Sequence, residues 1–250
     1  MKGVLDQVHA ALGRLLPDGV AGAVSDPTGD YGHSETPELA SVVDATTKRR
    51  REFAAGRYAA RAAMAGLGYP PYAIPGGADR APVWPGGLVG SISHCASACV
   101  AVSAPEGAML AIGIDIEPAE PLPPDLIETI CTPGERAWLA THLPGERGTL
   151  ARMIFSAKEA AYKCQYPLSS TVLDFDALTI RADDSGPGFR AVFRQPVAPF
   201  QTGSALPGRS VTAAGYILTC VYLPPAGIGA PMPFAPRLAE PRPEAMALPV

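Results

Sequence analysis

The sequence predicts a protein that combines α-helices with β-strands, and three kinds of segment carry this prediction. Residues 46–68 are rich in alanine, repeat apolar side chains at helical steps and end on two glycines. Residues 107–117 have the composition of a strand that stops at Pro118, because proline cannot continue a sheet ladder. Further β-forming segments, two of them alternating, lie near the carboxyl end: residues 174–184, 188–195 and 215–224.

Turn signals and composition predict the remaining elements. Residues 88–104 indicate two structured pieces joined at a Gly-Ser-Ile-Ser-His centre. From Pro224 onward the chain has the composition of a disordered tail. In chain order, the other expected elements are a helix before residue 25, loops over residues 25–38 and 69–87, a helix around residues 135–143, and a helix that contains residues 155–163.

Charge and cysteine content exclude several classes of protein. A net charge of -4 argues against general nucleic-acid binding, which relies on a basic surface. The amino-terminal segment carries Asp6, His9 and Arg14, unlike a signal peptide, and no apolar run is long enough to cross a bilayer. Five cysteines without a Cys-x-x-Cys pair indicate reduced thiols. We therefore expect a cytoplasmic protein without a nucleic-acid or membrane partner.

Arginines are dense on the helix predicted for residues 46–68. Arg50, Arg57 and Arg61 are spaced so that they share one face, and Phe53 and Met64 belong to the apolar face. Such a stripe is usually solvated, but here it is crowded on a protein with an acidic net charge. Solvation and the binding of an anion are both open.

Two carboxylates lie on the strand that ends at Pro118. Because side chains alternate along a strand, Asp115 and Glu117 share one face while Ile114 and Ile116 point to the other. Like charges on one face repel, so the pair indicates either an exposed edge or a divalent cation. Neighbouring carboxylates suit Mg²⁺, and Glu159 on the later helix could complete the site.

Two further motifs are weaker when taken alone. The small residues before His94 suit an anionic ligand, although a single histidine more often makes a structural hydrogen bond. His94, Cys95 and Cys99 could begin a zinc site, but the sequence shows no second half of one. Glu159 and Lys163 are four apart, which also fits an ordinary surface pair on a helix.

Taken together and in this order, the motifs resemble those of the Sfp/EntD-type 4'-phosphopantetheinyl transferases. Gly-Ile-Asp-Ile-Glu and Phe-Ser-Ala-Lys-Glu-Ala-Ala-Tyr-Lys fit two family motifs closely. The resemblance covers about residues 45–180 and is closest to actinobacterial members, which carry Lys-Arg-Arg-x-Glu-Phe on the arginine helix. Such enzymes transfer the phosphopantetheine arm of coenzyme A to a serine of an apo acyl or peptidyl carrier protein, and release adenosine 3',5'-bisphosphate.

The resemblance also implies roles for particular residues. Asp115, Glu117 and Glu159 would hold Mg²⁺, with Mn²⁺ as the alternative ion. Glu159 is the first choice for the general base and Glu135 the second, and Lys163 would assist catalysis. The implied contacts to coenzyme A are Lys158 and Lys163 to phosphates, His94 and the Ser93 backbone to the 3'-phosphate, Arg49 and Arg57 to the adenine nucleotide, and Arg80 from the loop before the tryptophan. Arg49 is the less secure of the two helix arginines, because an eight-residue step is about 80° off one face.

The fold implied by the resemblance is α+β, with two similar halves related by a pseudo-twofold axis and coenzyme A between them. The expected division is residues 1–111, residues 112–223 and a tail of residues 224–250, and the expected state is a monomer. The competing interpretation is an inactive relative that binds coenzyme A or a carrier protein without turnover. Another metal-dependent phosphotransferase is not supported by any Walker-type glycine loop.

Overall fold

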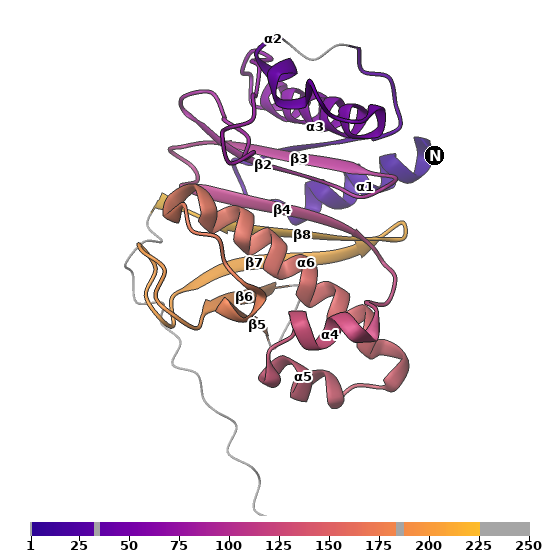
Figure 1. Ribbon diagram of the computed structural model, residues 1–250, viewed down its shortest axis with the longest axis vertical. Coiled ribbons are helices and arrows are strands. Elements are labelled where there is room, and N and C mark those ends of the chain that lie inside the picture. Colours follow the sequence, from indigo (N-terminus) through magenta and orange to yellow (C-terminus); the bar gives the residue numbers. More distant parts are fainter. Residues whose placement is uncertain (1, 33–35, 184–187, 226–250) are drawn as a thin grey trace, which may run out of the picture.

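Two antiparallel β-sheets with helices packed on them form the protein, which confirms the α+β class (Figure 1). The computed structural model describes residues 2–32, 36–183 and 188–225. The strand order is β1-β3-β2 in the three-stranded sheet and β4-β8-β7-β6-β5 in the five-stranded sheet. In the described part of the chain, no helix is both long and apolar enough to cross a membrane. The tail predicted after residue 223 lies outside the described residues from residue 226 onward.

The amino-terminal half contains the smaller sheet and the arginine-rich helix. Thr46 caps that helix, because its side chain accepts a hydrogen bond from the backbone N–H of Arg49. β1 was not predicted, since its small residues carry little strand signal. The elements are α1 (Lys2–Leu15), β1 (Ala21–Ser25), α2 (Thr36–Leu39), η1 (Ala40–Val42), α3 (Thr47–Gly66), β2 (Leu88–His94) and β3 (Cys99–Pro105).

The Gly-Ser-Ile-Ser-His motif is not the turn that the sequence predicts. Residues 90–94 form the carboxyl-terminal end of β2, which pairs with β3 down to the partners His94 and Cys99. The turn follows at residues 95–98, where the backbone N–H of Cys95 donates to the carbonyl of Ala98. Alternation along the strand therefore sets the direction of the Ser93 and His94 side chains.

The carboxyl-terminal half contains the larger sheet and the helix with the lysine-glutamate motif. β7 was not predicted, because Pro207 and Gly208 are poor strand formers; α4 was also missed. The elements are β4 (Ala111–Pro118), α4 (Pro124–Ile130), α5 (Pro133–Ala140), α6 (Pro144–Ser169), η2 (Phe175–Ala177), β5 (Leu178–Ala182), β6 (Gly188–Phe193), β7 (Ala205–Ala213) and β8 (Tyr216–Leu223).

The two sheets meet where β2 lies beside β4 (Figure 1). They are joined by side chains: the backbone N–H of Ile114 donates to Ser91 Oγ at 3.1 Å. Helix α1 packs Val8 and Leu12 into a core that both sheets share, which includes Ile114 and Val102. The expected boundary at residue 111 falls at the start of β4, and as a division into subdomains it stays a prediction.

Helix α6 lies directly on β4 at Gly113. A Cβ atom at this position would lie 1.9 Å from the carbonyl oxygen of Ala160 and 2.7 Å from the backbone nitrogen of Cys164. Both contacts are to backbone, so no side-chain rotation can relieve them. Glycine in the Gly-Ile-Asp-Ile-Glu motif therefore sets the distance between the strand that carries Asp115 and the helix that carries Glu159.

We expect Gly113→Ala to destabilise the fold by about 3 kcal/mol, because the added methyl group must push α6 away from β4. The measurement is the free energy of unfolding in urea. Gly13→Ala in α1 is the control: that helical glycine is exposed with nothing within 4 Å of a Cβ, and alanine should add up to about 1 kcal/mol of stability. Equal effects at the two sites would show that the close approach is unimportant.

Candidate active site

Asp115 lies at the junction of β2, β4 and α6, and only 3% of its surface is exposed. Its Oδ1 accepts a hydrogen bond from Ser93 Oγ at 2.8 Å, and its Oδ2 accepts one from Ser156 Oγ at 2.9 Å. Ser156 Oγ also lies 3.0 Å from Thr219 Oγ1 of β8, and it accepts from the threonine hydroxyl because its own hydrogen goes to Asp115. A buried carboxylate needs such partners, so three segments far apart in the sequence are held in register around it.

Lys163 neutralises this buried carboxylate. Its Nζ lies 2.7 Å from Asp115 Oδ1, and it also donates to Ser93 Oγ at 2.9 Å and to the carbonyl oxygen of Ile114 at 3.3 Å. The Ser93 hydroxyl therefore bonds to the lysine and the aspartate, where the resemblance implied only backbone contacts from this residue. The strand that carries Asp115 and the helix that carries Lys163 therefore lie in direct contact.

Glu117 shares a face with Asp115, as the alternation along β4 predicts. Arg152 of α6 pairs with it, with an Nη1 to Oε2 distance of 3.2 Å. Burial, and then the charges of Asp115 and Glu159, raise the pKa of Glu117 to about 7 in spite of this arginine. The charged form of Glu117 is therefore poorly accommodated in the free protein, and a further cation would stabilise it.

Glu159 faces the same group from α6. Burial raises the pKa of its carboxyl, with Lys163 opposing the rise and Asp115 adding to it. Glu159 also borders a cavity of about 190 Å³. The other residues that line this cavity are Lys158, Tyr162, Val172, Leu173, Asp174, Phe175 and Leu178.

The three predicted metal ligands are neighbours but are not arranged around a common point. Within residues 2–32, 36–183 and 188–225, no three His, Cys, Asp or Glu side chains are placed to hold a metal ion. Lys163 stands at Asp115, where a cation would bind. The chemistry of the donors nevertheless fits Mg²⁺, because they are three carboxylates, two with pKa values raised by burial and mutual repulsion.

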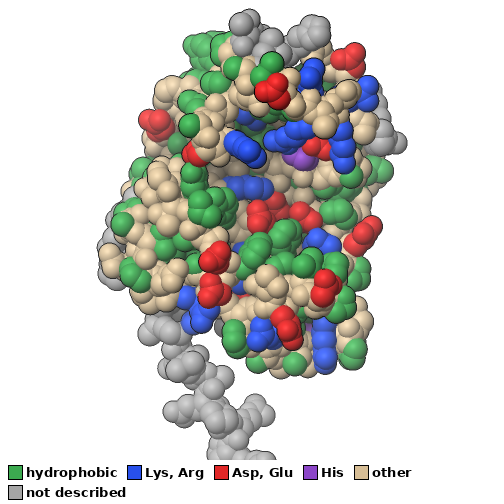
Figure 2. Space-filling view, in the orientation of Figure 1, with side chains coloured by type: hydrophobic (Ala, Val, Ile, Leu, Met, Phe, Trp, Pro, Cys, Tyr) green, Lys and Arg blue, Asp and Glu red, His purple; other side chains and the backbone are tan. Residues whose placement is uncertain are grey.

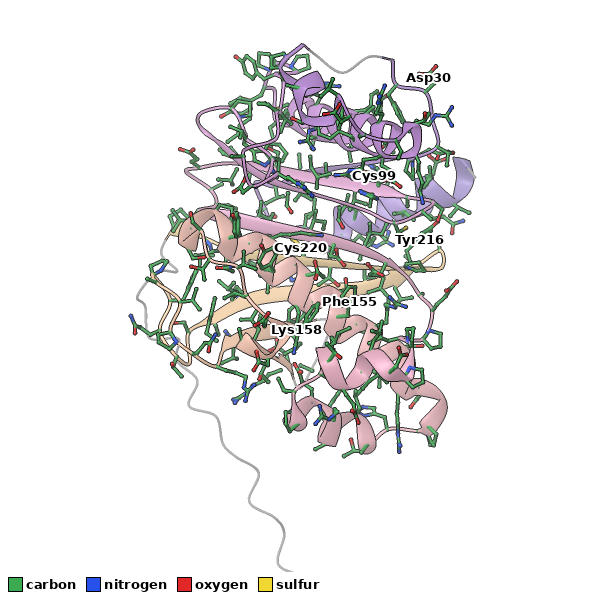
Figure 3. All side chains as sticks on the ribbon, viewed as in Figure 1. Asp30, Cys99, Phe155, Lys158, Tyr216 and Cys220 are labelled. Atoms are coloured by element: carbon green, nitrogen blue, oxygen red, sulfur yellow. The ribbon has the colours of Figure 1, made fainter. Side chains whose placement is uncertain are left out.

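Lys158 does not join this group, contrary to the prediction that it contacts a phosphate. Lys158, labelled in Figure 3, leaves α6 toward α4 and η2. Its side chain is 2% exposed. Its Nζ lies 2.7 Å from the carbonyl of Ile130, 2.8 Å from the carbonyl of Phe175 and 2.8 Å from Glu135 Oε2. Three acceptors match the three hydrogens of an ammonium group, so none is left for a ligand.

Glu135 is likewise fully engaged, contrary to its prediction as a second candidate base. Its Oε2 accepts from the backbone N–H of Thr132 in a capping box at the start of α5, as well as from Lys158. Its Oε1 accepts from the backbone N–H of Ile180 in β5 at 2.7 Å. Glu135 and Lys158 thus form a buried ion pair that joins α4, α5, α6 and β5.

A second charged group lies at the carboxyl end of β2. Arg49 Nη1 is 3.0 Å from His94 Nε2. A guanidinium can only donate, so Nε2 accepts and the free imidazole is neutral. Burial lowers the pKa of His94 in agreement with this, although Glu52, 3.9 Å from Nε2, opposes the shift. Figure 2 shows acidic side chains at the centre of this face, with Lys, Arg and histidine side chains above them.

The arginines of α3 do not act as one stripe. Arg57 is buried, and its Nε donates to the carbonyl of Ile74 at 2.7 Å. Arg61 pairs with the buried Glu38, while Arg50 is exposed and donates to carbonyls before the helix. Arg50, Arg57 and Arg61 share a face of α3 but are each held by partners of their own, and Arg49, the less secure choice, is the one beside His94.

Sequence reasoning missed Ser156, Arg152 and Glu52. Ser156 is the serine of the Phe-Ser-Ala-Lys-Glu motif, so its position one turn before Glu159 was a usable signal. Arg152 is seven residues before Glu159 and shares its face of α6. The Glu52 side chain is 14% exposed, and its Oε2 lies 3.7 Å from Arg49 Nη1 within the Lys-Arg-Arg-x-Glu-Phe motif.

Comparison with known proteins assigns a family to this arrangement. Residues 37–104 match the 4'-phosphopantetheinyl transferase N-terminal domain, and residues 111–221 match the 4'-phosphopantetheinyl transferase superfamily. The 4'-phosphopantetheinyl transferase Npt of Nocardia iowensis is 36% identical over 83% of this chain and 97% of its own length. The 4'-phosphopantetheinyl transferase Svp of Streptomyces mobaraensis is 37% identical over 76% of this chain and 79% of its own length.

Solved structures also match the chain, among them the holo-acyl-carrier-protein synthase of Thermotoga maritima. It aligns with a TM-score of 0.38 and 17% identity over 46% of this chain and 64% of that chain. The family follows instead from the sequence matches, which cover most of both chains. The chain belongs to the 4'-phosphopantetheinyl transferase superfamily and is an enzyme of that class.

Proposed function

We propose that the enzyme transfers the 4'-phosphopantetheine arm of coenzyme A to a serine of an apo acyl or peptidyl carrier protein, with Mg²⁺ or Mn²⁺, and releases adenosine 3',5'-bisphosphate. Its family membership supports the transfer to carrier proteins. The observation that carries the finer proposal is the buried Asp115, with Glu117, Glu159 and Lys163 around it. This group offers both an acidic site for a cation and an ammonium group for a phosphate. We further propose that the enzyme acts as a monomer.

Asp115, Glu117 and Glu159 would hold the metal ion. When bound, Mg²⁺ would polarise the pyrophosphate of coenzyme A and stabilise the leaving bisphosphate. Lys163 would then be released from Asp115 and could bind a phosphate oxygen. Phosphoryl transfer depends mainly on positioning and on neutralising charge, which these residues supply.

Glu159 is the general base in this proposal. The serine oxygen attacks the phosphorus that carries the pantetheine arm, the bond to the leaving bisphosphate breaks, and Glu159 takes the serine proton. A raised pKa suits a group that must accept a proton near neutral pH. Glu135 cannot take this role while both of its oxygens accept hydrogen bonds from Thr132, Lys158 and Ile180.

The two ends of coenzyme A would lie on opposite sides of Glu159. The cavity beside Glu159 has a mixed apolar and polar lining, which suits the pantetheine arm. Arg49 and His94 form a cationic pair for the 3'-phosphate at the nucleotide end, once the imidazole takes up a proton. Arg57 is buried and donates to the carbonyl of Ile74, so its role in this proposal is to stabilise the fold next to this pair.

Mass spectrometry of an apo carrier protein incubated with the enzyme, coenzyme A and Mg²⁺ tests the proposal. The carrier protein should gain the mass of one phosphopantetheine. If several acyl and peptidyl carrier proteins gain no mass while the enzyme binds coenzyme A, the competing interpretation of an inactive binding module holds instead.

We expect Asp115→Asn to reduce transfer by at least about 100-fold, because it removes a charge from the cation site but keeps the side-chain shape. Mg²⁺ should raise the melting temperature of the wild-type enzyme through binding linkage, and should not raise that of the variant. Asp125→Asn, at an exposed carboxylate of α4, is the matched control and should behave as wild type. Normal transfer by Asp115→Asn would refute the metal assignment.

His94→Ala should raise the KM for coenzyme A by about 10- to 150-fold, the range for a lost charge-assisted hydrogen bond. Dephospho-coenzyme A lacks the 3'-phosphate, so its KM should hardly change. Steady-state kinetics at saturating carrier protein give both values, and the cycle of two enzymes and two substrates isolates the contact. Equal losses on both substrates would mean that His94 only supports the end of β2.

Lys158→Met should destabilise the fold by about 3–5 kcal/mol, because it leaves Glu135 buried without its cation. Replacing both partners, as Lys158→Met with Glu135→Leu, should recover part of this loss. The measurement is again urea unfolding, accompanied by the dissociation constant for coenzyme A. A large loss of coenzyme A affinity with unchanged stability would instead make Lys158 a ligand.

A further inference from the structure

The loop between α3 and β2 has a tight tip that is built around Arg80. The backbone N–H of Gly77 donates to the carbonyl of Ala81 at 2.8 Å, and the N–H of Arg80 donates to the carbonyl of Gly77 at 2.9 Å. Gly76 and Pro82 form an isolated β-bridge below the tip. Arg80 has a φ of 68°, a left-handed conformation that favours glycine. Because this backbone conformation is strained for arginine, contacts from neighbouring residues must hold it in place.

Asp79 provides that support and also ties the tip to α6. Its Oδ1 accepts from the backbone N–H of Ala81 at 3.0 Å, which closes the turn on the far side of Arg80. Its Oδ2 accepts from the hydroxyl of Tyr166 at 2.9 Å. The backbone hydrogen bond first, and Tyr166 second, lower the pKa of Asp79, so the carboxylate is charged in this contact. Segments 87 residues apart are thus joined by one side-chain pair.

Tyr166 lies at the edge of the candidate active site. It is one helical turn after Tyr162, and the two rings lie 5.6 Å apart. Tyr162 lines the cavity that Glu159 borders, and burial first, then the charges of Glu159 and Asp79, raise the pKa of Tyr162. The tip of the loop is therefore fixed on the same helix that carries Glu159 and Lys163.

We propose that Asp79 and Tyr166 are positioning residues that hold Arg80 where its guanidinium contacts a phosphate of coenzyme A. The inference rests on the proposed function, and adds a residue pair that fixes the loop of the amino-terminal half against the catalytic helix. Arg80 is exposed, and no hydrogen bond or ion pair of its side chain occurs in the described part of the chain. Its charge is therefore available to a ligand.

The hydrogen bond between Asp79 and Tyr166, here called the tether, would behave differently in mutants if it had no functional role. Both Asp79 and Tyr166 lie at the surface, so loss of their hydrogen bond should hardly change global stability. If the tether positions Arg80, its loss should weaken coenzyme A binding and should do so only while Arg80 is present. If it is a surface contact alone, coenzyme A binding should not change.

The experiment is a double-mutant cycle with Tyr166→Phe and Arg80→Ala. Calorimetry without carrier protein gives the dissociation constant for coenzyme A, and kinetics give kcat and KM. Tyr166→Phe should weaken coenzyme A binding about 3- to 10-fold, the effect of losing one hydrogen bond, with kcat within about twofold of wild type. In the Arg80→Ala background the same change should have no further effect, because the pair acts through Arg80.

Two further variants sharpen the result. Asp79→Asn keeps an acceptor for the tyrosine and should retain most of the affinity, whereas Asp79→Ala also loses the hydrogen bond that closes the turn and should weaken binding at least as much as Tyr166→Phe. Tyr72→Phe is the matched control, since Tyr72 is an exposed tyrosine of the same loop, and it should behave as wild type. Amide hydrogen exchange of residues 76–82 in the free enzyme should be faster in Tyr166→Phe than in Tyr72→Phe.

The outcomes separate this inference from the proposed function. Additive losses for Tyr166→Phe and Arg80→Ala, or unchanged affinity in Tyr166→Phe with faster exchange in the loop, would overturn the positioning role while the enzyme still binds coenzyme A. A wild-type enzyme that does not bind coenzyme A would overturn the proposed function, and the inference with it. A cycle that shows full coupling supports both.

Discussion

The burial of the Asp115 carboxylate is the constraint on which the rest of the site depends. A charge that is 3% exposed must be paired and hydrogen-bonded, and its three partners come from two elements: Ser93 from β2, and Ser156 and Lys163 from α6. Because all of these partners must reach Asp115, they fix how the two sheets and α6 pack against one another. Gly113 makes this packing possible, since any side chain there would collide with the backbone of α6.

The same constraint explains how three carboxylates can lie close together in the proposed cation site. Glu117 and Glu159 add negative charge beside Asp115, and burial makes that charge costly. Lys163 and Arg152 offset the cost from α6, one at each end of the group. Because Lys163 stands where a metal ion would bind to Asp115, ion binding and release of the lysine are coupled in the proposed function. The lysine freed in this way is the one best placed for a phosphate.

Much of this arrangement follows from local patterns in the sequence. A period of two places Asp115 and Glu117 on one face of β4, and the helical pattern places Glu159 and Lys163 on one face of α6. Contacts across the fold could not be predicted in this way. No local signal shows that Arg57 is satisfied by the carbonyl of Ile74, or that a strand containing Pro207 pairs inside the sheet. Arg49 reaches His94 from the first turn of α3 because Thr46 fixes where that helix begins.

Lys158 and Glu159 show why a motif alone cannot assign roles to its residues. They are adjacent in the sequence, but successive side chains on a helix point about 100° apart. Glu159 therefore faces Asp115 across the seam with β4, while Lys158 faces α5 and finds Glu135 there. A lysine on that side is needed because Glu135, held in a capping box and by β5, is buried and must be neutralised. The motif thus carries Glu159, which we propose for the reaction, next to Lys158, which stabilises the fold, and α6 separates the two side chains by its geometry.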